Sequence, residues 1–223
     1  MTPSLLANKV IVITGAAGRL GQRLVKAFAE AGATIVALVY DAEKAYDLPF
    51  PDNAEGWAFP VDVTNEAQVQ EVFAHIRDQI GPVDAVIHTV GTWGMSPFAE
   101  MSLADWQHMM DLNLTSAFLT FREAIKAMDN GGRLIGYASA HGADGAQAQQ
   151  GAYGAAKAGV IRLIEAIAAE YAGQGITAHA IAPSTIAYDD DTDGVTADAL
   201  VDLTMMVAMA PAAPLSGQVI KAY

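Results

Sequence analysis

Short apolar runs alternate with longer amphipathic segments along the whole chain. Seven runs are rich in branched aliphatic residues and bounded by glycine or polar residues, which is typical of buried strands. They occupy 9–14, 33–39, 56–63, 83–90, 132–139, 176–182 and 217–222. Because such runs are apolar at nearly every position, we expect both faces of the sheet to be covered.

The segments between these runs have apolar residues every three or four positions, which predicts helices. Leu20, Leu24 and Phe28 share one face of the first helix, and Gly32 ends it. Asn65 is the expected N-cap of the second. The helical patterns cover 19–32, 65–76, 102–128, 151–173 and 196–209. The alternation predicts an α/β fold, a doubly wound parallel sheet of seven strands in three layers.

Composition limits the classes of protein that fit. The chain has 223 residues, of which 52% are hydrophobic, and this suffices for one packed domain over 1–223. It has no cysteine, which excludes disulfides, thiolate catalysis and cysteine-based zinc sites. No apolar run is long enough to cross a bilayer, and the N-terminus lacks the pattern of a signal peptide. The net charge of −13 disfavours nucleic acid. We therefore expect a cytoplasmic protein that binds a small molecule, and neither nucleic acid nor membranes.

The glycine-rich stretch TGAAGRLG follows the first strand and opens the first helix. This context is typical of a loop that holds a dinucleotide pyrophosphate on free N–H groups at a helix N-terminus. Its glycines permit two registers. In one, Gly15, Gly18 and Gly21 make the turn and the close approaches; in the other, Arg19 stands where a glycine is expected. Leu20 completes the predicted binding segment, and the alternative is a plain strand-to-helix turn.

The end of the second strand bears on the choice of dinucleotide, because an acid there binds the adenosine ribose hydroxyls of NAD. Val39 occupies the first position at which this acid is expected, and Asp41 follows two residues later. Asp41 either takes the ribose role or caps a helix. No arginine or lysine occurs at 39–42 to favour a 2′-phosphate, although Arg19 is free to turn toward one. The sequence therefore favours NAD over NADP.

Tyr153 and Lys157 lie four residues apart in a predicted helix, so their side chains share one face. A tyrosine has an ordinary pKa of about 10, and a nearby ammonium lowers this pKa. Such a tyrosine can transfer a proton at a substrate oxygen while a hydride moves at carbon. This spacing also occurs by chance between two residues of a helix that have no shared role. The position of the pair after the fifth strand favours a catalytic role.

The order of the motifs is far more specific than any one of them. They are TGAAGRLG, DV at 62–63, LNL at 112–114, YASAHG at 137–142, YGAAK at 153–157 and AIAPSTIAY at 180–188. In this order the chain resembles the short-chain dehydrogenase/reductase family, as a compact core-type member with an atypical glycine motif. The resemblance implies a Rossmann-like sheet of order 3-2-1-4-5-6-7 and a homotetramer or homodimer. It also implies hydride transfer between NAD or NADP and a small carbonyl or alcohol.

The resemblance further implies roles for individual residues. Tyr153 would be the acid/base, Lys157 would lower its pKa and bind the nicotinamide ribose, and Ser139 would polarise the substrate carbonyl. Asn113 would hold a water that links Lys157 to solvent. The remaining cofactor contacts would be Asp62 and Val63 at the adenine, Gly91 through close backbone approach, and Pro183, Thr185 and Ile186 at the nicotinamide. Simpler explanations stay open for three residues: Asn113 as a cap or a backbone bridge, Ser139 as a small residue at a strand end, and Asp62 as a helix cap, a role that is compatible with its adenine contact.

Several positions depart from the family's usual pattern. The fourth strand ends in HTVG, from His88 to Gly91, where Asn-Asn-Ala-Gly is usual, and we expect His88 to be a buried structural donor. One extra residue separates Ser139 from Tyr153, which predicts a small bulge between them. Ser184 replaces the usual glycine after the sixth strand and demands a less permissive backbone there.

The segment expected to shape the substrate site, near 184–196, is short and acidic, which predicts an open pocket. Asp189, Asp191 and Asp193 resemble the start of a calcium loop, but Leu200 stands where the loop's glutamate would be, so we expect no metal. The candidate substrate contacts are Trp93, Met95, His141 and Tyr188. Of these, His141 either contacts substrate or faces solvent.

Three functions fit these residues. The first is an oxidoreductase that moves a hydride between the cofactor and a small carbonyl or alcohol. The second is a dinucleotide-binding regulator or scaffold without turnover. It would explain the departures from the family pattern at Arg19, at HTVG and in the short loop near 184–196. Such a protein has no physical need for Asn113, Ser139, Tyr153 and Lys157 together. The third is an epimerase or dehydratase that uses transient oxidation. The Thr-Gly-x-x-Gly-x-x-Gly spacing of TGAAGRLG resembles that of extended family members and favours this option, whereas the lack of a large C-terminal substrate domain counts against it.

Overall fold

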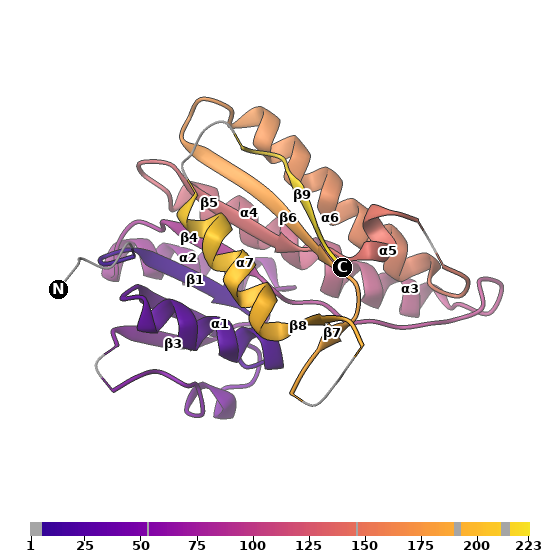
Figure 1. Cartoon of the computed structure of the whole chain (residues 1–223), viewed down its shortest axis with the longest axis horizontal. Helices are drawn as coiled ribbons and strands as arrows, with labels where there is room; N and C mark the ends of the chain where they lie inside the picture. Colours follow the sequence, from indigo (N-terminus) through magenta and orange to yellow (C-terminus); the bar gives the residue numbers. More distant parts are fainter. Residues whose placement is uncertain (1–5, 53, 146, 190–192, 211–214) are drawn as a thin grey trace.

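A seven-stranded parallel sheet forms the centre of the molecule in a computed structural model that describes residues 6–52, 54–145, 147–189, 193–210 and 215–223 (Figure 1). The strand order is β3-β2-β1-β4-β5-β6-β9, which confirms the expected order with β9 as the seventh strand. The strands are β1 (Val10–Thr14), β2 (Thr34–Val39), β3 (Gly56–Pro60), β4 (Ala85–His88), β5 (Gly132–Tyr137), β6 (Ile176–Pro183) and β9 (Val219–Ala222).

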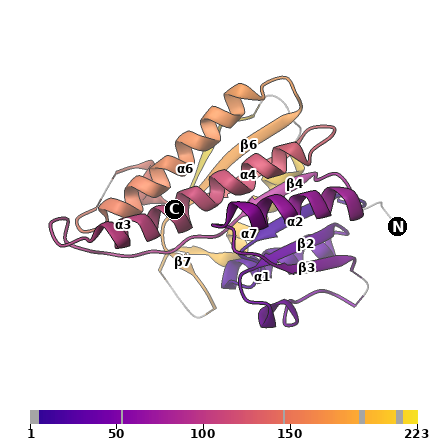
Figure 2. The same cartoon turned by 180° about the vertical axis from the view of Figure 1, so that it is seen from behind.

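Helices cover both faces of this sheet, so the fold is the expected three-layer, Rossmann-like α/β arrangement. One face carries α1 (Arg19–Glu30) and α7 (Ala197–Met209), which lie in front in Figure 1. The opposite face carries α2 (Glu66–Gln79), α4 (Ser116–Lys126) and α6 (Gly151–Glu170), which Figure 2 shows from behind.

The side chains of each central strand alternate between two hydrophobic cores, one on each face. In β1, Val10 and Val12 pack on the α2–α4–α6 side, whereas Ile11 and Ile13 pack on the α1–α7 side. Because successive side chains of a strand point to opposite faces, a strand between two helical layers must be apolar at every position. This explains why the strands appear in the sequence as continuous apolar runs.

The long helix expected over 102–128 is divided into three parts. These are α3 (Leu103–Met110), a π turn η2 (Asp111–Thr115) and α4. In the π turn the N–H of Ser116 binds the carbonyl of Asp111, five residues back, instead of the carbonyl of Leu112. Apolar spacing cannot reveal a single wide turn, because the helix continues on both sides of it; such turns are frequent at functional sites.

Two further elements lie at the carboxyl end of the sheet, where ligands bind in folds of this class. The short helix α5 (Ala140–Ala143) follows β5, in the segment where a small bulge was expected. A two-stranded parallel sheet, β7 (Ile186–Ala187) and β8 (Val195–Thr196), lies within the expected loop over 184–196 and was not foreseen. The centre of the acidic stretch, 190–192, lies outside the described residues. None of the described helices is long and apolar enough to span a membrane.

Candidate active site

A cavity of about 950 Å³ lies at the carboxyl ends of the central strands. Most of the residues predicted to bind cofactor or substrate line it. They include the glycine loop and the four residues that the family resemblance makes catalytic. They are Gly15, Gly18, Arg19, Leu20, Gly21, Asp41, Gly91, Trp93, Asn113, Ser139, His141, Tyr153, Lys157, Pro183, Thr185, Ile186 and Tyr188. The remaining predicted residues, Asp62, Val63 and Met95, are not among its lining residues.

The glycine loop adopts the register with Gly15, Gly18 and Gly21. Gly15 has a φ of 66°, which favours glycine, and a Cβ there would lie 2.7 Å from the Thr89 Oγ1. A Cβ on Gly21 would lie 2.2 Å from the Gly15 carbonyl oxygen, so this glycine lets α1 pack against the loop. Gly18 is the N-cap of α1 and has no side-chain cap, which leaves the first N–H groups of α1 for a ligand at the cavity wall.

Arg19 is the first residue of α1 and does not stand in a glycine position. Its guanidinium lies 4.0 Å from the centre of the Tyr188 ring, and its Nη2 lies 3.1 Å from the Asp189 Oδ2. Arg23, one turn later, donates to the other carboxylate oxygen of Asp189 at 2.5 Å. Arg19 therefore reaches across the mouth of the cavity toward the segment after β7. The segment after β7 is a partner for Arg19 that the sequence did not show.

The π turn presents Asn113 to the loop that follows β4. The Asn113 Oδ1 accepts from the Thr92 N–H at 3.1 Å, and Nδ2 donates to the carbonyls of Thr92 and Met109, each at 3.0 Å. A Cβ on Gly91 would lie 2.6 Å from the Asn113 Oδ1 and 2.9 Å from the Lys157 Nζ. The lack of a side chain at Gly91 therefore keeps open the point that both groups face.

Lys157 is buried on α6, and its ammonium donates to the carbonyl oxygen of Tyr137 at 2.9 Å. Burial lowers the pKa of Lys157 from 10.5 to about 8, because the charged form loses its water. The parallel strand β5 ends at Tyr137, so the sheet supplies the carbonyl that anchors the lysine.

Ser139, His141 and Tyr153 meet at the other side of the cavity. The Ser139 Oγ accepts from the His141 N–H at 3.1 Å and so caps α5, and it lies 3.4 Å from the His141 Nδ1. The rings of His141 and Tyr153 pack edge to face, with centres 6.1 Å apart. His141 thus faces the cavity and not bulk solvent alone.

The pKa of Tyr153 differs from the expectation. Burial raises this pKa, and a hydrogen bond with Ser139 acts in the opposite direction. Burial of the phenol dominates, so the net lowering expected of this pKa does not occur. In this structure the phenol is therefore in its protonated form at neutral pH.

The family model for short chain dehydrogenases matches residues 9–196, most of the chain. The chain belongs to the short-chain dehydrogenase family. It is 36% identical over 190 residues to nodulation protein G of Azospirillum brasilense, covering 82% of this chain and 77% of that protein. It is 32% identical over 186 residues to D-threitol dehydrogenase of Mycolicibacterium smegmatis, covering 81% and 71%. A crystal structure of a short chain dehydrogenase from Mycobacterium smegmatis aligns over 99% of this chain and 93% of its own, at 25% identity and a TM-score of 0.88. As a family member the protein is an oxidoreductase that acts on CH–OH or C=O groups.

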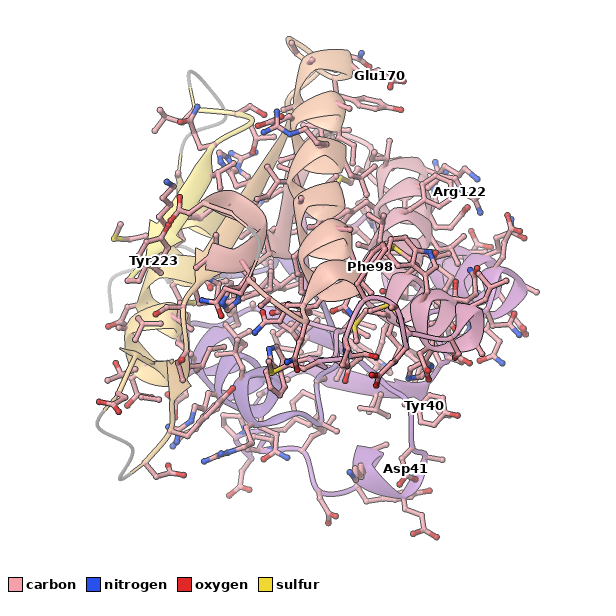
Figure 3. All side chains as sticks on the ribbon, turned by 90° about the vertical axis from the view of Figure 1, so that its right-hand side faces the viewer. Tyr40, Asp41, Phe98, Arg122, Glu170 and Tyr223 are labelled. Atoms are coloured by element: carbon pink, nitrogen blue, oxygen red, sulfur yellow. The ribbon has the colours of Figure 1, made fainter. Side chains whose placement is uncertain are left out.

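In this short-chain dehydrogenase the segment after β2 contains a residue that sequence reasoning missed. Asp41 accepts from the Glu43 N–H at 3.0 Å, which makes a local turn before the 3-10 helix η1 (Glu43–Ala45). The N-cap of η1 is Ala42, so Asp41 does not take the expected role of a helix cap. Lys44 follows in that turn and also lines the cavity, beside the exposed Tyr40. Figure 3 shows Tyr40 and Asp41 at the edge of the molecule. Lys44 lies beyond 39–42, the positions at the end of β2, and only the turn brings it back to the cavity.

Asp62 is not the cap of α2. Its Oδ1 accepts from the backbone N–H and hydroxyl of Thr64, at 2.9 and 2.6 Å, which makes a local turn. Asn65 caps α2 instead by accepting from the Gln68 N–H at 3.2 Å, as its own sequence context predicted. Asp62 is three residues too early to reach the free N–H groups of that helix.

Replacing Gly91 with alanine tests the shared space in front of Asn113 and Lys157. We expect Gly91→Ala to weaken NADH binding and turnover at least about tenfold, because the new methyl group would displace the Asn113 amide from Thr92. Fluorescence titration of NADH measures this. Gly94→Ala is the matched control, since its Cβ would meet only the flexible end of Met109. NADH affinity within twofold of wild type for Gly91→Ala would contradict the prediction.

Proposed function

We propose that this short-chain dehydrogenase transfers a hydride between NAD or NADP and a small carbonyl or alcohol, with Tyr153 as the acid/base. The observation that carries the proposal is that one cavity joins the glycine loop to Asn113, Ser139, Tyr153 and Lys157. A ligand pocket of this size and position is typical of a cofactor together with a small substrate.

The described residues fit a nicotinamide dinucleotide. Gly15 and Gly18 bring bare backbone to the cavity wall, and α1 directs its positive end there. Gly91 leaves the opposite wall open, next to Lys157. The bound cofactor would supply or accept the hydride, and the protein's own groups would hold the substrate oxygen and move its proton.

Ser139 and Tyr153 are the groups that would meet the substrate oxygen. Their hydrogen bond, and the protonated state of the phenol, fit a donor pair that stabilises negative charge as a carbonyl is reduced. In this direction Tyr153 gives its proton to the oxygen; in alcohol oxidation it receives one. Lys157 would bind the nicotinamide ribose and favour the phenolate once the proton has left.

Asn113 would support this proton transfer through Lys157. Both of its N–H groups are engaged by backbone carbonyls, whereas Oδ1 has one acceptor position left beyond the Thr92 N–H. That oxygen and the Lys157 Nζ face the same point in front of Gly91. A water that bridges these two groups beside Gly91 would link Lys157 to solvent.

We further propose that NAD is preferred over NADP, that 1–223 forms one domain, and that the protein is a cytoplasmic homotetramer or homodimer. The dinucleotide preference rests on Asp41, whose carboxylate would repel a 2′-phosphate. Lys44 and Arg19 line the same cavity and act against this preference.

The cofactor preference is tested by removing one negative charge. Asp41→Asn should raise the ratio of NADPH to NADH affinity about tenfold, which corresponds to about 1.4 kcal/mol. Asp47→Asn changes the same charge on an exposed residue that does not line the cavity and should leave the ratio unchanged. Equal effects of both variants in fluorescence titrations would mean that only net charge matters.

Arg19→Gly should leave turnover intact and shift the ratio of NADPH to NADH affinity toward NADH. A large gain in affinity for both cofactors would contradict the placement of Arg19 at the mouth of the cavity.

The proposed function itself is tested with both reduced cofactors and a broad panel of carbonyl compounds. Saturable NADH or NADPH binding, with cofactor oxidised in step with carbonyl reduction, is the expected result. Binding without turnover on any compound would favour a regulatory or scaffold protein. Product formation without net cofactor consumption would favour an epimerase or dehydratase.

A further inference from the structure

We propose that His88, which does not line the cavity, is a positioning residue that couples the glycine loop after β1 to the π turn that carries Asn113. His88 is the last residue of β4, and only 2% of its surface is exposed. The effect of this coupling on cofactor binding rests on the proposed function, whereas the coupling between the glycine loop and the π turn does not.

Both ring nitrogens of His88 have hydroxyl partners from distant parts of the chain. Nδ1 lies 2.9 Å from the Oγ1 of Thr14, the last residue of β1 and its register partner in the sheet. Nε2 lies 3.2 Å from the Oγ of Ser116, the first residue of α4. The edge of the ring packs against Phe121, with ring centres 5.7 Å apart.

The positions of the hydrogens in this series of hydrogen bonds follow from counting the available donors. Ser116 has one hydroxyl hydrogen and donates it to the Leu112 carbonyl at 2.7 Å, so toward His88 it must accept. The Nε2 of His88 therefore carries the ring hydrogen, and Nδ1 accepts from the Thr14 hydroxyl. The bonds run in one direction, from Thr14 through His88 and Ser116 to Leu112.

Each end of this chain of bonds lies beside a functional element. The Thr14 carbonyl accepts from the Thr89 hydroxyl at 2.8 Å, and the left-handed Gly15 follows directly. At the other end, the Leu112 carbonyl lies in the π turn and loses its usual helical partner, because the Ser116 N–H binds Asp111. The Ser116 hydroxyl replaces that partner. His88 thus holds the glycine loop and the π turn in one fixed relation.

His88 keeps its hydrogen in place over the working pH range. Burial, and the charge of nearby Lys157, lower the pKa of His88 to about 3. A charged ring would carry hydrogens on both nitrogens and would have no acceptor for Thr14. The coupling therefore does not switch with pH; it is a permanent part of the site.

A double-mutant cycle tests the coupling. Thr14→Val and Ser116→Ala each break one end of the chain, and each should weaken NADH binding about fivefold. The two residues interact through His88, so the double variant should weaken NADH binding no more than about tenfold, well short of the product of the single effects. Thr14→Ser keeps the hydroxyl and should restore most of the loss. Thr120→Val, at a buried hydroxyl without a partner, is the matched control and should change nothing.

Two further measurements keep the test decisive. Nitrogen NMR of the wild-type protein should show the Nε2–H tautomer of His88 without titration between about pH 5 and pH 9; an Nδ1–H tautomer or a titrating ring would overturn the proposal. Additive effects of Thr14→Val and Ser116→Ala on both NADH binding and unfolding would also overturn it. If the wild type binds neither NADH nor NADPH, the proposed function fails, and the same cycle measured on the free energy of unfolding still decides whether the two ends are coupled.

Discussion

Tyr153→Phe is expected to lower turnover about 10³-fold while NADH affinity stays within about twofold of wild type. The variant removes the hydroxyl that hydrogen-bonds Ser139 and that would exchange a proton with the substrate oxygen. The ring keeps its edge contact with His141, so the wall of the cavity is preserved. Steady-state kinetics on a substrate found in the carbonyl panel, together with NADH titration, separates the two effects.

The raised pKa of Tyr153 also sets the direction of the pH dependence. A protonated phenol is the form that donates to a carbonyl, so carbonyl reduction should persist at neutral pH and decline as the pH rises through this pKa. Alcohol oxidation should show the opposite trend. Tyr171→Phe, at the C-cap of the same helix and away from the cavity lining, is the matched control and should change neither rate nor pH profile. Turnover of Tyr153→Phe above a tenth of wild type would remove Tyr153 from the reaction.

Lys157→Met is expected to lower turnover about 10²-fold or more and to change how stability depends on pH. The variant deletes the buried ammonium that faces the point in front of Gly91, and with it the proposed contact to the nicotinamide ribose. NADH affinity should fall in parallel with turnover, unlike in Tyr153→Phe, because Lys157 would contact the cofactor itself. Kinetics and NADH titration on the same preparations distinguish these two patterns.

The stability effect follows from the lowered pKa of Lys157. The unfolded chain binds this proton up to about pH 10.5, whereas the folded protein releases it above about pH 8. Between these values the unfolded state holds more protons, so the free energy of unfolding rises with pH. For this lysine alone the gain between pH 7 and pH 9.5 is about 2 kcal/mol. The penalty is fully present below pH 8, where the folded protein holds a buried charge.

Denaturant unfolding at both pH values measures this gain. Other groups titrate in the same range, so the quantity that matters is the difference between wild type and Lys157→Met, which should lack the rise. Lys26→Met removes an exposed lysine on α1 and should keep the pH dependence of the wild type. An identical rise in Lys157→Met would show that the lysine is not desolvated in the folded protein.

Much of the fold was predictable from local pattern. The seven strands, the three layers and the cap at Asn65 were expected, because strand and helix periodicities and capping residues act over a few positions. The sheet order was implied by the resemblance to the family, and the structure confirms it. The assembly of Gly15, Ser139, Tyr153 and Lys157 in one cavity was also expected. Parallel strands all end at the same edge, so residues that follow them are brought together whatever their distance in sequence.

Other features depend on contacts that no local pattern encodes. The π turn at 111–115, the pairing of β7 with β8, and the contact of Arg19 with Asp189 arise only when distant segments meet. The pKa of Tyr153 was predicted in the wrong direction for the same reason. Spacing places Lys157 on the right face of α6, but tertiary structure decides that its ammonium binds the Tyr137 carbonyl and that the phenol is buried.

By itself the sequence determined the class of fold and most of the residues gathered at the carboxyl edge, because these follow from periodicity and from the order of motifs. Tertiary structure alone decided how those residues are held. His88 was expected as a buried donor, but its two partners come from β1 and α4, and Lys44 enters the cavity only through a turn. The physical reason is that apolar pattern specifies which face of an element is buried, whereas hydrogen-bond direction and desolvation depend on atoms supplied by other elements.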